Sequence, residues 1–424
     1  MGTVLRDVRT IAHHNQPVDI RIDGNTITAI APSPIAQRED DDIIDAGGKL
    51  AIPGLINAHG HAPMTLLRGI ADDVPLQMWL EQAIWPAEAS LTEDDVYWGT
   101  LLAQVEMLRS GTTQFVDMYF HVDAIGRAVA EGGLRALLSY GMIADRLDRK
   151  GQGEIDRSKQ LIRTWHEEAD GRIRIAVAPH AIYTCGEEIW REAVALATRY
   201  NVPIHTHVCE TKKEVDNWRD SHGRTPIEEL LNLGVFSVPT VAAHCVHVDA
   251  EDIGTLADSH VTVAHCPASN AKLGSGIAPL DLFLRHGVRV ALGTDGAASN
   301  NNLDLLRDMR LAILLQKASR QDPTAMNAET AFALATLNGA AACGTNAGAL
   351  EAGTLADLVL IDLERCSTMP VHRPLSAVVY ASDPASVTDV FIDGRSVLRN
   401  GELLTLDEEK IRAEVKRIGS RLVG

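Results

Sequence analysis

The two ends of the chain carry short segments in which apolar and polar residues alternate. Residues 18–22 and 26–30 alternate in this way on either side of an Asp-Gly-Asn turn at 23–25, an arrangement that predicts a β-hairpin. Residues 356–361 and 390–397 show the same strand pattern near the other end. Because the two ends resemble each other and differ from the middle, we predict that they assemble into one small β domain.

The middle of the chain alternates between helical and strand patterns. One helix is well marked, because the capping sequence Ser90-Leu91-Thr92-Glu93 precedes apolar residues at helical spacing through 98–108, and Gly111 can end the helix. Strand patterns lie at residues 114–118, 173–177, 240–243 and 261–264. Strands that alternate with helices predict parallel pairing with right-handed crossovers.

These patterns predict an α/β protein in which a (β/α)8 barrel of the TIM type is joined to a small β-sandwich built from both chain ends. Residues 55–348 provide about 290 residues for the barrel, which suits this fold with insertions. Residues 1–54 and 349–424 would form the composite sandwich. A doubly wound parallel sheet is the alternative for the middle of the chain, but it would not easily bring five or more distant strand ends to one place.

Composition and charge narrow the class of protein. Of the 424 residues, 46% are hydrophobic and 23% are charged, as is ordinary for a globular protein. The formal net charge of −18 argues against a nucleic-acid polymer or an anionic membrane as partner, because phosphate would be repelled. The sequence contains no run of about 18 apolar residues and no signal-peptide pattern at its start. Its six cysteines form no CxxC pair, which favours reduced thiols in a cytoplasmic protein.

Histidines and a carboxylate follow three of the apolar runs. His59 and His61 come directly after the run at 55–58, and side chains two residues apart point to the same side of a strand, so both can bind one ion. His207 and Asp295 each follow a further apolar run, and Asp295 lies in a turn flanked by glycines. Because parallel strands end at the same rim, these donors predict a metal site at the mouth of the barrel.

The donor set also indicates which ion is bound. No lysine occupies the strand ends before His180 or His207, where some two-metal barrels carry a modified lysine that bridges their ions. We therefore expect one ion. Imidazole nitrogens with one carboxylate oxygen suit Zn²⁺, and Fe²⁺ and Mn²⁺ are the alternatives.

Further polar residues end strands or follow the predicted ligands. Glu210 comes three residues after His207, so an acid would lie beside the ion; the alternative is a carboxylate at a helix N-terminus. His180 and His244 each end a strand, and either could be a ligand, an acid–base group or a substrate contact. A compact site needs one member of the pair His205 and His207, so we assign His207 as the ligand and His205 to the core or to support of the ligands.

The chain resembles the amidohydrolase superfamily, most closely the branch of 5-methylthioadenosine/S-adenosylhomocysteine deaminases and triazine hydrolases. The resemblance covers essentially the whole chain. It begins at the sequence Pro-Gly-Leu-Ile-Asn-Ala-His-Gly-His of residues 53–61 and includes His-Val-Cys-Glu-Thr at 207–211 and Gly-Thr-Asp-Gly at 293–296. The other segments that carry it are residues 64–69, 84–88, 117–120, 178–180, 243–247, 269–273 and 297–300.

The resemblance implies a role for individual residues. The ion ligands of the family fall on His59, His61, His207 and Asp295. Its acid shuttle falls on Glu210, and its strand-end histidine falls on His244. Glu88 would contact ribose hydroxyls and His180 the purine. Family arginines that bind a homocysteine carboxylate follow the third strand, where Arg146 and Arg149 are the candidates.

The implied reaction is metal-assisted hydrolytic deamination of an adenosine-type substrate, 5-methylthioadenosine or S-adenosylhomocysteine, to the inosine derivative and ammonia. A bound ion lowers the pKa of water toward about 7. Asp295 would then take a proton, Glu210 would protonate the ring nitrogen and His244 would stabilise the oxygen of the tetrahedral centre.

Three alternatives to this reaction are open, and the resemblance also implies an assembly state. The substrate could be another aminated ring such as guanine, cytosine or a pterin, or the leaving group could be chloride or an alkylamine on a triazine. A non-catalytic scaffold is the third alternative. The family resemblance also implies a homo-oligomer with one zinc ion per subunit.

Overall fold

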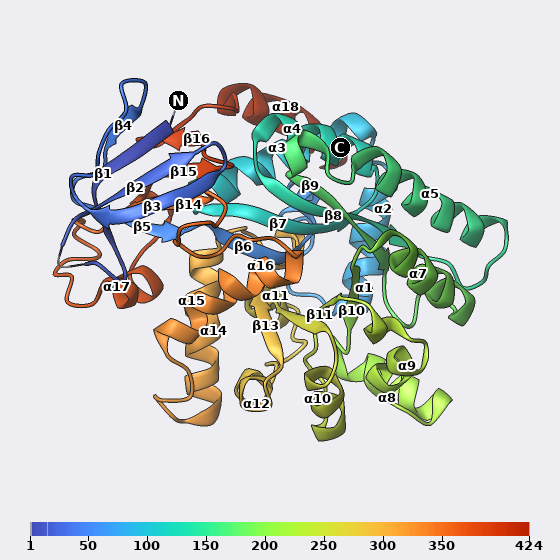
Figure 1. Ribbon diagram of the computed structural model, residues 1–424. Coiled ribbons are helices and arrows are strands. Elements are labelled where there is room, and N and C mark those ends of the chain that lie inside the picture. The colour runs from blue at the N-terminus through green and yellow to red at the C-terminus, as the bar shows by residue number, and fades with distance from the viewer. Residues whose placement is uncertain (1, 15, 424) are drawn as a thin grey trace.

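Eight parallel strands form a nearly closed barrel in the computed structural model, which describes residues 2–14 and 16–423. Each strand pairs with the next one along the chain, so all of their carboxyl ends meet at one rim. The helices that connect these strands lie around the outside of the barrel (Figure 1). The strands are β6 (Leu55–Gly60), β7 (Thr112–Tyr119), β8 (Arg135–Met142), β9 (Ile173–Pro179), β10 (Ile204–Val208), β11 (Thr240–His244), β12 (Val261–His265) and β13 (Arg289–Leu292).

Side-chain and loop hydrogen bonds join the first and last strands of the barrel. The amide of Asn57 donates to Thr294 Oγ1 at 2.7 Å, and its carbonyl oxygen accepts from the Thr294 backbone N–H at 2.9 Å. The backbone N–H of Asp295 donates to the carbonyl of His59 at 3.0 Å. These bonds hold the residues that follow β13 against the end of β6, which brings two of the predicted ligands together.

A second sheet combines strands from both ends of the chain (Figure 1). Its order is β17-β16-β15-β14-β5-β1-β2-β3, and β4 pairs with β1. Apolar side chains from both halves of this sheet share one core, which includes Leu5, Ile20, Leu358 and Phe391. The strands are β1 (Gly2–Thr10), β2 (Val18–Asp23), β3 (Thr26–Pro32), β4 (Asp42–Asp45), β5 (Lys49–Pro53), β14 (Leu358–Asp362), β15 (Val387–Ile392), β16 (Arg395–Arg399) and β17 (Glu402–Leu403). The predicted barrel with a small β unit from both termini is confirmed.

The longer helices are α3 (Glu93–Arg109), α4 (Val122–Gly132), α5 (Arg149–Trp165), α7 (Glu187–Tyr200), α8 (Lys212–His222), α10 (Ala250–Ala257), α14 (Leu305–Arg320) and α18 (Glu408–Val423). The shorter ones are α1 (Leu76–Trp79), α2 (Trp85–Glu88), α6 (Glu168–Gly171), α9 (Pro226–Asn232), α11 (Pro267–Lys272), α12 (Leu280–Arg285), α13 (Ala297–Asn300), α15 (Ala328–Leu334), α16 (Leu337–Cys343) and α17 (Pro374–Tyr380). Within the described residues, no helix is both long and apolar enough to cross a bilayer.

Helix α3 exists as predicted, but it begins with a different cap. Its N-cap is Thr92, whose hydroxyl accepts from the backbone N–H of Asp95, while the Asp95 carboxylate accepts from the backbone N–H of Thr92. The predicted box of Ser90 with Glu93 is therefore wrong by two residues. Leu91, directly before the cap, is buried in the core. The helix therefore begins after this residue.

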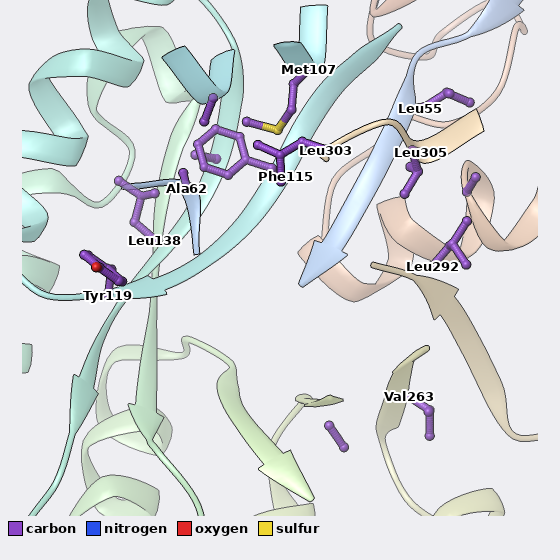
Figure 2. Close-up of a cluster of buried hydrophobic side chains, with 14 of the residues drawn as sticks. Leu55, Ala62, Met107, Phe115, Tyr119, Leu138, Val263, Leu292, Leu303 and Leu305 are labelled. Carbon is purple, nitrogen blue, oxygen red and sulfur yellow. The ribbon is translucent and has the colours of Figure 1, made fainter. Parts of the chain in front are cut away.

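Helix α3 packs its apolar side against the barrel. Met107 of the helix lies beside Phe115 of β7 and Leu303 in the close-up of the buried cluster (Figure 2). Phe115 is among the largest fully buried side chains. Because β7 ends at the rim where the predicted ligands lie, this packing fixes one wall of the site.

A buried ion cluster joins the second sheet to the opposite end of the barrel. Arg135, the first residue of β8, donates to Asp357 at 2.6 Å and to Asp393 at 2.5 Å, and the three side chains are between 1% and 7% exposed. Both aspartates belong to the C-terminal part of the chain. The attachment of the sheet thus lies away from the rim that carries the predicted site.

Removing the arginine of this cluster should destabilise the protein. We expect Arg135→Ala to lower the free energy of unfolding by about 3–5 kcal/mol, because two buried carboxylates lose their cation. Arg395→Ala, which breaks an exposed pair with Asp170, should cost less than about 1 kcal/mol. Denaturant unfolding of both variants measures the difference, and equal losses would contradict a structural role for the buried cluster.

Candidate metal centre and active site

The barrel brings histidines from separate strands into contact at its carboxyl rim. The ring centroid of His59 lies 4.9 Å from that of His61, 4.9 Å from that of His207 and 5.4 Å from that of His244. His59 is on β6, His61 follows that strand directly, and His207 and His244 are on β10 and β11. The parallel order of the strands therefore assembles these rings around His59.

A metal ion fits the donor atoms of this cluster. One atom from each of His59, His61 and His207 lies within 4.8 Å of the others, and the same holds for His59, His244 and Asp295. Asp295 Oδ1 is 3.5 Å from His59 Nε2 and 3.3 Å from His61 Nε2. Nε2 of His59 is buried and has no hydrogen-bond partner within the described part of the chain. A buried lone pair of this kind is expected of a ligand atom.

The charges of these groups also suit a cation. Burial lowers the pKa of His59 to about 4, against the raising effect of the Asp295 carboxylate. Burial likewise holds the pKa of His207 well below its usual range. Burial alone would raise the pKa of Asp295, but the neighbouring histidines, His59 first, hold it well below its usual value. Neutral imidazoles and an ionised carboxylate are the forms that coordinate metals.

Backbone carbonyls orient two of the imidazoles. His61 Nδ1 donates to the carbonyl of Met118 at 2.6 Å, and His207 Nδ1 donates to the carbonyl of His180 at 2.8 Å. A carbonyl accepts only, so the proton of each ring is on Nδ1 and the Nε2 lone pair faces the cluster. Such outer hydrogen bonds set the tautomer of metal-binding histidines.

A directed chain of hydrogen bonds sets the tautomer of His59. Ser139 Oγ donates to the carbonyl of Asp117 at 2.7 Å, so its oxygen can accept from His205 Nδ1 at 3.3 Å. His205 Nε2 is then an acceptor, and it lies 2.8 Å from His59 Nδ1. His59 therefore carries its proton on Nδ1 and directs the Nε2 lone pair into the cluster. His205 thus contacts His59, a predicted ligand, from the side opposite its Nε2 atom.

Backbone strain is concentrated at the strand ends that carry the site. Cys209, His244, Cys245 and Asp295 all have positive φ angles, between 46° and 75°. Such left-handed conformations cost residues other than glycine about 1–3 kcal/mol each and persist where the surrounding structure holds them. The N–H of Cys245 donates to the carbonyl of Val208 at 2.9 Å, which holds one of these turns in place. The turns point His244 and Asp295 inward where an extended strand would carry them past the rim.

Glu210 and His244 form an acid–imidazole pair beside the cluster. Glu210 Oε2 lies 3.8 Å from His244 Nε2, and Asn270 Oδ1 accepts from His244 Nδ1 at 2.9 Å. Burial raises the pKa of Glu210, an effect that the charge of His244 opposes. Burial lowers and the carboxylates of Glu210 and Asp295 raise the pKa of His244, with a net rise. The pair can exchange a proton with a bound molecule.

The carboxylate at the start of helix α8 belongs to Glu214 and not to Glu210, for which this role was the alternative. Helix α8 has Thr211 as its N-cap, and Glu214 in its first turn accepts from the backbone N–H groups of Cys209 at 3.1 Å and Glu210 at 2.8 Å. Glu210 itself precedes the helix and lines the pocket. Glu214 therefore holds the backbone of Glu210 in place and leaves the Glu210 carboxylate available.

A pocket opens from the cluster toward solvent. Glu210, His244, His61 and Asp295 lie on its lining together with His180 and Glu88, and the remainder is mostly apolar. Glu88 is half-buried, at the end of α2, and burial raises the pKa of its carboxyl to about 7, against the lowering effect of the Tyr119 phenol. The structure thus brings Glu88 and His180 together with the metal cluster in a single cavity.

The two candidate arginines lie outside this pocket. Arg146 is 81% exposed and pairs with the neighbouring Asp145 at 3.5 Å, and Arg149 is the exposed first residue of α5. The loop after β8 directs both side chains into solvent. Neither is placed with the other predicted site residues.

Comparison with known proteins identifies the family. The model of the amidohydrolase family matches residues 50–397. This chain belongs to the amidohydrolase family. It is 47% identical over 405 residues to a 5′-deoxyadenosine deaminase of Methanothermobacter thermautotrophicus, covering 96% of this chain and 95% of that protein. It is 44% identical over 431 residues to a 5-methylthioadenosine/S-adenosylhomocysteine deaminase of Thermoanaerobacter pseudethanolicus, covering 100% of both.

Solved structures of similar amidohydrolases contain zinc. An adenosine deaminase from Xanthomonas campestris with bound zinc superimposes with a TM-score of 0.93 at 36% identity, covering 99% of this chain and 98% of that one. An atrazine chlorohydrolase from Arthrobacter aurescens in complex with zinc gives a TM-score of 0.91 at 26% identity, covering 98% and 100% of the two chains. The family and the His/Asp cluster together support a metal-dependent amidohydrolase.

Several residues of this amidohydrolase site were missed by sequence reasoning. Ser269 donates to Asp295 Oδ2 at 2.6 Å, and Ser275 donates to Glu210 Oε1 at 3.4 Å. Asn270 orients His244, and Glu214 holds the backbone before α8. Ser269 and Asn270 lie in the segment 269–273, which carries the family resemblance and could have indicated them. Ser275 and Glu214 lie outside such segments, and the sequence does not distinguish them from other loop or helix residues.

The hydrogen bonds from Ser139 through His205 to His59 predict how a change at His205 affects zinc affinity. We expect His205→Leu to weaken zinc binding by about 10–100-fold, because His59 loses the acceptor that fixes its tautomer. His205→Gln should stay within about fivefold of the parent, since a glutamine Oε1 can still accept the His59 proton. Competition with a chromophoric chelator measures the affinity. Equal losses in both variants, or none, would show that the bond does not orient His59.

Proposed function

We propose that this amidohydrolase is a zinc-dependent deaminase of adenosine-type nucleosides, releasing ammonia and the inosine derivative. The observation that carries the proposal is that Glu210 and His244 lie 3.8 Å apart in a pocket that is also lined by His61, His207, Asp295 and Glu88. The names of similar proteins, 5′-deoxyadenosine deaminase and 5-methylthioadenosine/S-adenosylhomocysteine deaminase, support the same substrate class.

In this proposal His59, His61, His207 and Asp295 hold one Zn²⁺ ion per chain. When bound, such an ion supplies a water molecule that ionises near neutral pH. Asp295 would accept a proton from the attacking water, because its carboxylate lies within the cluster and stays ionised. Ser269 donates to Oδ2 of that carboxylate and fixes its orientation.

The remaining residues act on the purine. Glu210 would donate its proton to the ring nitrogen next to the amino-bearing carbon, so that negative charge does not build up on the ring. His244, with its Nδ1 proton held by Asn270, directs Nε2 toward the oxygen of the tetrahedral centre and can donate a hydrogen bond there. His180 would contact the purine edge, and the Glu88 carboxylate would accept hydrogen bonds from the ribose hydroxyls.

Compartment and assembly belong to the same proposal. The described cysteines are all free, and only Cys366 is exposed, which supports a reducing, cytoplasmic setting. The expected homo-oligomer rests on the family resemblance. Light scattering of the purified protein tests whether it forms a homo-oligomer.

Metal removal and one substitution separate binding from catalysis. We expect the chelated protein to be inactive and Zn²⁺ to restore ammonia release from 5′-methylthioadenosine. Glu210→Gln should reduce kcat by about 10²-fold or more while zinc content stays unchanged, because the variant cannot donate a proton. Near-full activity of this variant would overturn the assignment of the acid. Guanine and a chlorotriazine serve as comparison substrates, and a preference for either would overturn the substrate class.

Glu88 predicts how substrate binding depends on pH. Its pKa is raised to about 7, so the carboxyl becomes protonated as pH falls from 8 to 6 and loses its strength as an acceptor. We expect KM for the nucleoside to rise roughly tenfold over this interval. Glu88→Gln cannot titrate, so its KM should be high and nearly independent of pH. A parallel pH profile for parent and variant would contradict ribose binding by this carboxylate.

A further inference from the structure

The lining of the pocket indicates which adenosine derivatives are preferred. We propose that the enzyme selects adenosines with an uncharged 5′ substituent, such as a hydrogen or a methylthio group, over S-adenosylhomocysteine, whose 5′ substituent ends in an amino acid. This inference rests on the proposed function. It concerns the 5′ substituent, which neither the ion nor the residues proposed to bind the purine and the ribose would contact.

The polar residues of the pocket are already assigned to the ion, the purine and the ribose. What is left of the lining is apolar, including Trp79, Ile84, Phe120 and Ile143. The polar exceptions are few. Ser299 has its hydroxyl engaged with Ser269 and the carbonyl of Gly296, and the half-exposed Tyr183 carries a neutral phenol. A 5′ substituent that runs along any wall of the pocket therefore meets mainly apolar side chains.

The charged groups of the pocket would oppose a carboxylate. The acids on the lining are Glu88, Glu210 and Asp295, its imidazoles are already assigned to the ion, the purine and the reaction, and no lysine or arginine of the described chain is among the lining residues. Behind the wall at Ile143 lies a further acid, Glu154, which accepts from the Ile143 backbone N–H at 3.3 Å. A carboxylate that loses water here meets no lysine or arginine on the lining, and an unpaired buried charge is costly.

The arginines nearest in sequence do not supply that cation. Arg146 is 81% exposed and is paired with Asp145. Arg149 is exposed at the start of α5, where Asp148 caps the helix. Near the end of β8, Tyr140 is neutral, and its hydroxyl donates to Glu154 Oε1 at 3.5 Å. Neither Tyr140 nor Glu154 is among the lining residues, and the third-strand side contributes Gly141 and Ile143, which carry no charge.

Four nucleosides of graded size and charge test the proposal. They are 5′-deoxyadenosine, 5′-methylthioadenosine, 5′-butylthio-5′-deoxyadenosine and S-adenosylhomocysteine. The butylthio compound has the same sulfur and carbon count as the homocysteine chain but no charge, so it separates charge from length. We expect kcat/KM for S-adenosylhomocysteine to be at least about tenfold below that for the butylthio compound.

Each outcome of this comparison bears on a separate claim. Equal values for the butylthio compound and S-adenosylhomocysteine would overturn the selection while leaving the deaminase intact. If none of the four is deaminated, the proposed function itself fails, and this inference fails with it.

Variants of the wall provide a second test. Ile143→Arg should raise the ratio of kcat/KM for S-adenosylhomocysteine to that for the butylthio compound by about fivefold or more, and the neutral control Ile143→Gln should not. Lys213 lines a neighbouring groove that shares Tyr183 with this pocket. If Lys213→Ala selectively loses activity on S-adenosylhomocysteine, that lysine binds the carboxylate and the proposal is wrong.

Discussion

The structure depends on a cluster of buried nitrogen lone pairs around His59. Its Nε2 atom has no hydrogen-bond partner among the described residues, and the ring centroids of His61, His207 and His244 lie within 5.4 Å of the His59 ring centroid. An unsatisfied polar atom in a protein interior costs about 1–3 kcal/mol, and the neighbouring Asp295 carboxylate adds a buried charge. A divalent cation relieves both costs, because it bonds the lone pairs and neutralises the carboxylate. The arrangement is favourable chiefly as a metal site.

The rest of the molecule supports that cluster at a distance. The barrel delivers strand ends to one rim, and the left-handed turns at His244 and Asp295 aim those side chains inward. The second sheet is attached at the other end through Arg135 and its two aspartates. The rim is therefore left open for the pocket, whose lining includes the groups proposed to bind purine and ribose.

Much of this organisation could be predicted from the sequence. The alternation of strand and helix patterns gives the barrel, and two-residue spacing puts His59 and His61 on one side of β6. Both are local consequences of strand geometry. The cap of α3 was misplaced because Ser90 and Thr92 both satisfy the local pattern, and the choice between them is made by the burial of Leu91 in the core.

The remaining features depend on contacts that are distant in sequence. His205 has two-residue spacing from His207, and only the third strand, through Ser139, shows which of the pair supports a ligand. Asn270 reaches the site from α11 and Ser275 from the loop that follows this helix, and tertiary packing sets the position of both. Arg146 likewise faces solvent because of the conformation of its loop. Its position after the third strand could not show this.

The most direct test of this account is anomalous X-ray diffraction at the zinc absorption edge from crystals of the zinc-loaded protein. A single zinc site at the barrel rim predicts one anomalous peak per chain, within coordination distance of His59 Nε2, His61 Nε2, His207 Nε2 and the Asp295 carboxylate. It also predicts that His205 lies outside the coordination sphere. A peak ligated by His205 instead of His207, a second bridged ion, or no ion among these residues would contradict it.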